Sequence, residues 1–385
     1  MTQTEEPKGI ERLWALVGKV QQRGPGWLWQ RIKREFLLPT TGPTRMLGRI
    51  RVALERSSRR FTRPSRAVDS DTLFYFLDLE VCPITYDNVT YLAAAELRRR
   101  QLGLSAIHVV VVPGTVAGLR AETPDYEVAI DAEARRWRLY NLVVPLFRLL
   151  PSCTGYVICG SREEALRGPY AQAEHVFPVG YSVNVPIAPI NRETCDAARA
   201  GHPVLPMLRA TPKGLAYMRQ FLEPRAQGRR VVVINLRYSA FMPVRNSNDE
   251  NWFAFARELD KTRWLPVFVL DTDVALAPPP RALDEFVVCH AAPWNNELRM
   301  ALYELADLTM SIGQGPMELC WFNDRCRYAL FLRPNASPQS SDEAHRAHGF
   351  EIGQNPPYAV AGQRWVWASD DLPIIRSVFA EMTAE

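Results

Sequence analysis

The chain has 385 residues, of which 47% are hydrophobic and 23% are charged. This composition is typical of a soluble globular protein with room for two domains, and it excludes a disordered chain. No run of about 18 apolar residues exists, so no membrane-spanning helix is predicted. The seven cysteines form no CxxC pair. Neither a zinc site nor a disulfide framework is therefore indicated, and a reducing cytoplasm fits best.

Positive charge is concentrated in residues 1–66, which hold fifteen Lys/Arg and five Asp/Glu, while the whole chain carries +4. Three segments here combine apolar residues at helical spacing with arginines, and Trp14, Trp27 and Trp29 lie among them. Basic amphipathic helices with tryptophans bind anionic lipid surfaces. We predict that residues 1–66 form a basic amphipathic helical arm that attaches the protein to an anionic membrane surface, the inner face of the cell membrane. The alternative is that these helices pack on the protein or on a second subunit.

Nucleic acid is disfavoured as a partner, because the rest of the chain is net negative and carries no recognisable binding motif.

Residues 67–205 are predicted to form an α/β domain. Strands are expected at 73–79 and 106–112, with a helix between them whose apolar face starts at Val89. A further helix is expected over 131–150. The second strand is apolar on both faces, as in a parallel sheet. The proline-rich stretch 181–205 is interpreted as a crossover to the next domain.

Residues 206–385 repeat the alternation of strands and helices. Strands are predicted at 230–236, 264–270, 285–289, 308–312 and 326–332, and helices lie between several of them. The predicted fold class is α/β, with two Rossmann-like, doubly wound domains facing each other across a cleft.

The stretch 306–322 is the most informative part of the second domain. Its apolar strand ends at Ser311 and Ile312, the chain turns at Gly313 and Gly315, and Pro316 favours the start of a helix. A glycine turn followed by a helix N-terminus presents free backbone N–H groups to a phosphate or pyrophosphate. The alternative is a plain strand-to-helix turn.

Ligands of such sheets lie beyond the carboxyl ends of the strands, which makes Arg237, Arg245, Asn246 and Asp271 candidate ligand contacts. A guanidinium grips phosphate oxygens with two parallel hydrogen bonds, and it neutralises a departing diphosphate. Arg237 is therefore a candidate for binding and for catalysis. Asp271 and Asp273 have three interpretations: a divalent-ion pair, a ribose acceptor at Asp271, or solvated loop carboxylates.

Two further carboxylates are candidate site residues, one on each side of the predicted cleft. Glu318, in the first turn of the predicted helix, would repel phosphate and fits better as a ribose acceptor or as a partner of the helix dipole. Asp87 is a candidate general base for an acceptor hydroxyl, and it is equally explained as a helix N-cap. His345, His348 and Glu343 lack a third ligand at suitable spacing, so no metal site is predicted.

The run Ile234-Asn-Leu-Arg-Tyr238, followed by Arg245-Asn-Ser247, resembles the His-x-Arg region of fucosyltransferases that use GDP-fucose, which belong to the GT-B glycosyltransferases with two Rossmann domains. Asn235 stands where those enzymes have histidine. Residues 306–322 are similar to the GT-B segment that holds the donor nucleotide. The resemblance implies that residues 206–385 bind the donor, with donor-binding roles for Arg237, Ser311, Gly313, Gly315 and Glu318. It also implies that residues 67–205 bind the acceptor and that no metal is needed.

The resulting hypothesis is a hexosyltransferase. It would move a hexose from a nucleotide diphosphate sugar, with a GDP-sugar as one candidate, to a hydroxyl of an envelope glycan or lipid-linked acceptor. No tightly bound cofactor is expected. Two alternatives remain: a non-catalytic membrane-attached scaffold with a degenerate sugar-nucleotide fold, and a nucleotide-sugar epimerase.

Overall fold

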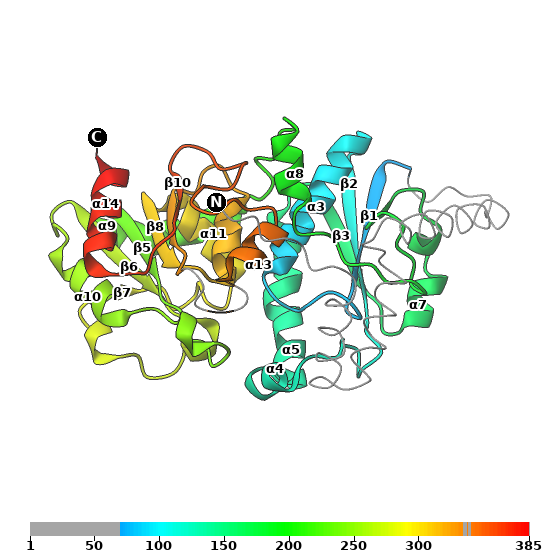
Figure 1. Ribbon diagram of the computed structural model, residues 1–385, viewed down its shortest axis with the longest axis horizontal. Helices are drawn as coiled ribbons and strands as arrows, with labels where there is room; N and C mark the ends of the chain where they lie inside the picture. The colour runs from blue at the N-terminus through cyan, green and yellow to red at the C-terminus, as the bar shows by residue number, and fades with distance from the viewer. Residues whose placement is uncertain (1–69, 334–336, 338–339, 385) are drawn as a thin grey trace, which may run out of the picture.

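The computed structural model describes residues 70–333, 337 and 340–384, and the predicted arm of residues 1–66 lies outside them. The described chain contains two parallel sheets, which Figure 1 shows side by side with helices packed between them. None of the helices in these ranges is long and apolar enough to span a bilayer.

The first sheet has the order β3-β2-β1-β4, and every pair of neighbours is parallel. Its central strand β1 is buried along its whole length, because apolar side chains cover both faces as a parallel sheet requires. The strands are β1 (Thr72–Asp78), β2 (Ala106–Val112), β3 (Cys153–Ile158) and β4 (Val176–Phe177). The helices are α3 (Asp87–Leu102), α4 (Pro124–Ala129), α5 (Ala132–Arg138), α6 (Val144–Leu146), α7 (Arg162–Arg167) and α8 (Glu193–Arg199).

The second sheet has the order β7-β6-β5-β8-β9-β10, again with parallel pairs throughout. Counted from its own first strand this is 3-2-1-4-5-6, the order of dinucleotide-binding folds, and it places the topological switch point between β5 and β8. The strands are β5 (Arg230–Asn235), β6 (Trp264–Val269), β7 (Val287–Val288), β8 (Leu308–Ile312), β9 (Tyr328–Phe331) and β10 (Gln363–Val366).

The helices of the second domain are α9 (Pro212–Ala226), α10 (Asp249–Glu258), α11 (Asn296–Leu305), α12 (Glu318–Trp321), α13 (Asp342–Ala347) and α14 (Leu372–Thr383). Local sequence explains several of their ends. Thr211 caps α9 by accepting a hydrogen bond from the Gly214 N–H, and Pro212 stands at its first position. Asn295 caps α11 in the same way.

The structure departs from the expected elements in two places. A single helix was expected over 131–150, but the chain forms α5, a π-helical turn over Leu139–Val143, α6 and a 3-10 turn over Phe147–Leu149. Strand β10 was not predicted, because its four residues include two polar ones, Gln363 and Arg364, and give no clear pattern. Strands β2 and β8 match the predicted ranges.

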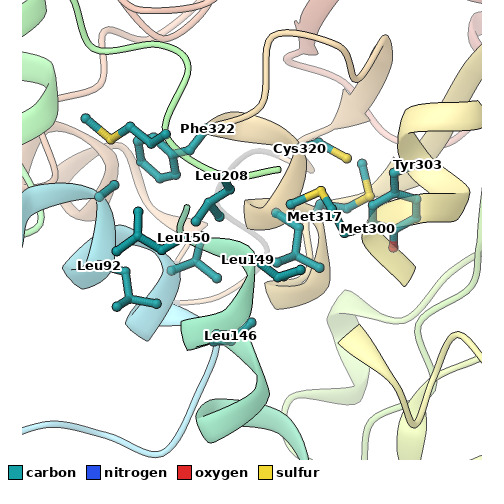
Figure 2. Packing of buried hydrophobic residues seen from close by; sticks show 14 of the residues in the cluster. Leu92, Leu146, Leu149, Leu150, Leu208, Met300, Tyr303, Met317, Cys320 and Phe322 are labelled. Carbon is teal, nitrogen blue, oxygen red and sulfur yellow. The ribbon is translucent and has the colours of Figure 1, made fainter. Parts of the chain in front are cut away.

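A shared apolar core joins the two domains. Side chains from both domains belong to one buried cluster, in which leucines of α3, α6 and the following turn meet residues of α11 and α12. Figure 2 shows Leu149 next to Met317 and Met300, with Leu92 on the opposite side of the cluster near Leu150. The facing surfaces are apolar here, and their contact is stabilised because it excludes water.

Candidate functional site

The loops that follow β5 and β8 meet at the switch point of the second sheet. Strand β5 pairs with β8 up to Asn235 and Ser311. The Arg245 side chain crosses between the two loops, because its Nη2 donates to the Gly313 carbonyl at 3.0 Å. Two loops that are far apart in sequence therefore lie side by side, as expected for loops that follow neighbouring parallel strands.

Arg237 is buried, with 7% of its surface exposed, and it organises its own loop. Its Nη1 donates to Asn246 Oδ1 at 2.6 Å and to the Met242 carbonyl at 3.1 Å. Its Nη2 donates to the Phe241 carbonyl at 2.7 Å. Asn246, predicted as a ligand contact, instead accepts from this guanidinium and from the Ser239 N–H at 3.0 Å. Three acceptors thus hold Arg237 in place.

Arg237 and Arg245 form no ion pair with any carboxylate in the described part of the chain. Burial and the neighbouring Arg245 lower the pKa of Arg237 to about 10, and Asp271 opposes this shift. Burial also lowers the pKa of Arg245. An unneutralised buried charge is costly, so the pair favours an anion as the missing partner.

Asp271 lies at the end of β6, on the other side of β5 from β8. Its Oδ1 accepts from the Thr272 N–H at 2.8 Å and its Oδ2 from the Tyr238 N–H at 3.3 Å. Burial and then the neighbouring Asp273 raise its pKa, while Arg299, Arg138 and Arg237 act in the opposite direction. A half-buried carboxyl at the end of the second strand has the position of a ribose acceptor in dinucleotide sites.

The interpretation of Asp271 and Asp273 as a divalent-ion pair receives no support from the geometry. Both carboxylate oxygens of Asp273 accept from Arg138 Nη2 of the first domain, at 2.8 and 2.6 Å. Within residues 70–333, 337 and 340–384, no group of three His, Cys, Asp or Glu residues could hold a metal ion.

The loop after β8 differs from the predicted phosphate-binding turn. Pro316 does stand in a first helical turn, but that turn is 3-10 (Gly315–Met317) and is followed by only four α-helical residues. So short a helix carries little of the dipole expected to attract a phosphate. A Cβ added at Gly315 would lie 2.9 Å from Tyr86 Cβ, so this glycine packs against the first domain. Its place in the fold is explained by close packing.

Ser311 and Gly313 also have structural neighbours. The Ser311 hydroxyl is fully buried, donates to the Asn235 carbonyl at 3.2 Å and accepts from Gln314 Nε2 at 2.6 Å. A Cβ at Gly313 would lie 3.1 Å from Leu332 Cδ2. The donor-binding roles predicted for Ser311, Gly313 and Gly315 stay predictions, and Gly313 lines a small cavity.

Glu318 points toward the first domain, so its predicted contact with a ribose stays a prediction. Its Oε2 accepts from the Thr90 hydroxyl of α3 at 3.1 Å, and 8% of the residue is exposed. Burial and the neighbouring Asp87 raise its pKa well above the ordinary value. Glu318 therefore favours its neutral form inside the domain interface.

Asp87 occupies the first turn of α3 and accepts from the Thr85 hydroxyl at 2.8 Å. The N-cap position belongs to Tyr86, so the interpretation of Asp87 as the cap is wrong by one residue. Asp87 acts on groups of the second domain: it raises the pKa of Glu318, and it opposes the lowering of the His348 pKa that burial causes. The predicted base thus faces the second domain.

Aromatic and polar contacts between the domains surround the switch point, and sequence reasoning missed them. Tyr126 of α4 packs edge-on against Phe241, and Trp137 of α5 packs against Trp294, with ring centroids 5.1 and 5.2 Å apart. The Tyr86 hydroxyl donates to Asn296 Oδ1 at 2.8 Å. Isolated aromatic residues in loops and short helices carry no periodic signal, so the sequence does not predict which of them are in contact.

No family model matches the sequence, and no curated protein sequence matches it. Solved structures with a similar arrangement include a glycosyl transferase family 9 protein from Veillonella parvula, at 10% identity and a TM-score of 0.48, covering 83% of this chain and 99% of that one. ADP-heptose LPS heptosyltransferase II from E. coli has 8% identity and a TM-score of 0.44, covering 81% and 98%. The NodZ α-1,6-fucosyltransferase has 9% identity and a TM-score of 0.26, covering 66% and 93%. At these values the likeness concerns the fold alone.

Proposed function

We propose that the protein binds a nucleotide diphosphate sugar at the carboxyl ends of β5 and β8 and transfers its hexose to a hydroxyl of an envelope glycan or lipid-linked acceptor. One observation carries the proposal: the buried Arg237 and the half-buried Arg245 lie together at the switch point without an ion-paired carboxylate among the described residues. A diphosphate would supply the missing negative charge.

The same charges suit the chemistry of transfer. The acceptor oxygen attacks the anomeric carbon, and the bond from that carbon to the diphosphate breaks with its electron pair on the departing oxygen. The two guanidiniums would stabilise the charge that develops there. Asp87 would take the acceptor proton, because it lies in the first turn of α3 and faces the second domain.

Binding is tested by adding nucleoside diphosphates and their sugars, one at a time, to the full chain in calorimetric titrations. At least one should bind, and Arg237→Ala should abolish turnover with that donor. The matched control is Arg281→Ala, because Arg281 is an exposed arginine in the 3-10 turn Arg281–Leu283. Unchanged donor affinity and rate in Arg237→Ala would remove the proposal.

A second candidate, the non-catalytic scaffold, is favoured by the closed interface. Tyr86 fills the space at Gly315, and Trp137 packs on Trp294 of the second domain. A donor would have to fit beside these contacts. A scaffold predicts no heat with any nucleotide or nucleotide sugar, so the same titrations separate the two candidates.

A further inference from the structure

A small cavity lies between the carboxyl ends of β8 and β9, one strand away from the switch point. Its volume is about 60 Å³, far below the roughly 300–1,000 Å³ of pockets that hold whole small molecules. It therefore has room for one small group. Its walls combine residues that follow the two strands with side chains from the loop after β5 and from α13: Arg245, Ile312, Gly313, Phe331, Leu332, Arg333, Ser340 and His345.

Arg245 brings unused hydrogen-bond donors to this cavity. A guanidinium has five N–H groups, and the single acceptor that Arg245 meets among the described residues is the Gly313 carbonyl. Arg237 differs, because three acceptors of its own loop already occupy its two terminal nitrogens. Of the two arginines, Arg245 is the one free to bind a ligand.

His345 lies on another wall of the cavity with one ring nitrogen fixed. Its Nδ1 is 2.9 Å from the Ser341 carbonyl, so Nδ1 carries the proton that is donated there. The ring packs against Trp365 and Trp367, which hold its orientation. Among the described residues, Nε2 has no hydrogen-bond partner and remains free for a ligand.

The cavity is positively charged. Arg333 adds a second arginine to the walls and is anchored by Asp370, which accepts from its Nη2 at 2.8 Å, and by the Val244 carbonyl. No carboxylate is among the lining residues. Small size, unused N–H donors and positive charge together indicate an anion of the size of a phosphoryl group.

We propose that this cavity binds one phosphoryl group of the ligand, with Arg245 donating N–H groups to its oxygens and His345 Nε2 contacting it from the facing wall. Arg237 is then a positioning residue that shapes the loop presenting Arg245. The inference rests on the proposed function, since the phosphoryl group would belong to the donor diphosphate.

Binding should also take up a proton. Burial lowers the pKa of His345, and the neighbouring His348 and Arg245 act in the same direction, while Ser341 and Asp342 oppose them. Arg333 also faces the cavity as a cation. A phosphoryl anion beside Nε2 reverses this balance, so His345 becomes doubly protonated and donates to the ligand.

Inorganic phosphate and nucleoside diphosphates are titrated separately into the full-length protein, in two buffers of different ionisation enthalpy. Both should bind the wild type with proton uptake. Arg245→Gln should lower the affinity for phosphate at least about tenfold, as expected for the loss of a charge-assisted hydrogen bond. His345→Gln should abolish the uptake. If Arg245→Gln does not fold, Arg245→Lys replaces it in the same titrations. This variant keeps the charge but loses the paired N–H groups of the guanidinium, so it should also bind phosphate more weakly than the wild type.

The matched control is Arg167→Gln, because Arg167 is an exposed arginine lining a wider groove on the first domain. It should leave phosphate binding unchanged. Two outcomes overturn the inference and leave the proposed function standing. In one, phosphate binds Arg245→Gln as tightly as it binds the wild type. In the other, a nucleotide binds the wild type and Arg245→Gln with the same affinity. Phosphate binding that depends on Arg245, with no nucleotide bound, supports the cavity and removes the proposed function.

Discussion

Glu318 allows a sharp test of the domain interface, because its carboxyl is buried against α3. The substitution Glu318→Gln removes the ionisable group and keeps an oxygen that can accept from the Thr90 hydroxyl. Burial and the neighbouring Asp87 raise the pKa of Glu318 well above the ordinary 4.5. The folded wild type therefore holds a proton that the unfolded chain releases once the pH exceeds 4.5.

The sign and size of the effect follow from proton linkage. Between the unfolded and the folded pKa the native state binds one proton more than the unfolded state. The free energy of unfolding of the wild type therefore falls by up to about 1.4 kcal/mol per pH unit. The stability that protonated Glu318 contributes is fully present below the pKa of this group in the unfolded chain, and it is lost as the pH rises through the pKa in the folded protein. Glu318→Gln has no such loss, so its advantage over the wild type grows with pH.

The measurement is urea unfolding of both proteins between pH 5 and pH 8. The difference in the free energy of unfolding should rise with pH along the slope given above, while groups common to both proteins cancel. Glu343→Gln is the control, since Glu343 is an exposed carboxyl on α13, and it should change stability by less than about 0.5 kcal/mol. A difference between wild type and Glu318→Gln that is constant over this range would refute the reasoning.

Three further predictions concern the first domain and the arm. Arg162→Met leaves Asp78, a fully buried carboxylate that Arg162 contacts at 2.8 and 3.0 Å, without its cation, and should cost about 3–5 kcal/mol in chemical unfolding. A cost below about 1 kcal/mol would show that the Tyr181 hydroxyl and the Glu80 N–H, which donate to this carboxylate at 2.7 and 2.9 Å, satisfy it without Arg162. Asp87→Asn should lower the rate of transfer about 10²–10⁴-fold, and Asp125→Asn, which alters an exposed first-turn acid of α4, should not; equal rates would exclude Asp87 as the base. Deleting residues 1–66 should release the protein from anionic vesicles in a sedimentation assay and leave the two domains folded, and equal binding of the truncated form would contradict membrane attachment through the arm.

The strands were largely predictable because each is a short apolar run with its own boundaries. Strand β8 and the turn at Gly313 were identified from local sequence, and so was the position of Arg237 directly after β5. The rule that parallel strands end at a common edge then brought Arg237, Arg245 and Asp271 to one region. Local pattern and topology were sufficient for these residues.

The partners of those residues could not be predicted in the same way. Glycines at 313 and 315 have the same local appearance, yet one lines a cavity and the other packs against Tyr86 from more than two hundred residues away. Whether a glycine serves a ligand or a neighbouring side chain depends on what the other domain places there. The sequence suggested only metal binding for His345. Arg245 and His345 line the same cavity, but they are a hundred positions apart in the chain, so their proximity is visible only in the folded protein.

The sequence alone determined the alternation of strands and helices, the two α/β domains and the polar residues at the strand ends, because each depends on neighbours a few positions away. Tertiary structure decided that one apolar core joins the two domains, and that Glu318 is buried against Thr90. It also decided that Arg245, rather than Arg237, has donors to spare. Burial and hydrogen-bond partners arise from segments distant in the chain, and only the folded arrangement brings them together.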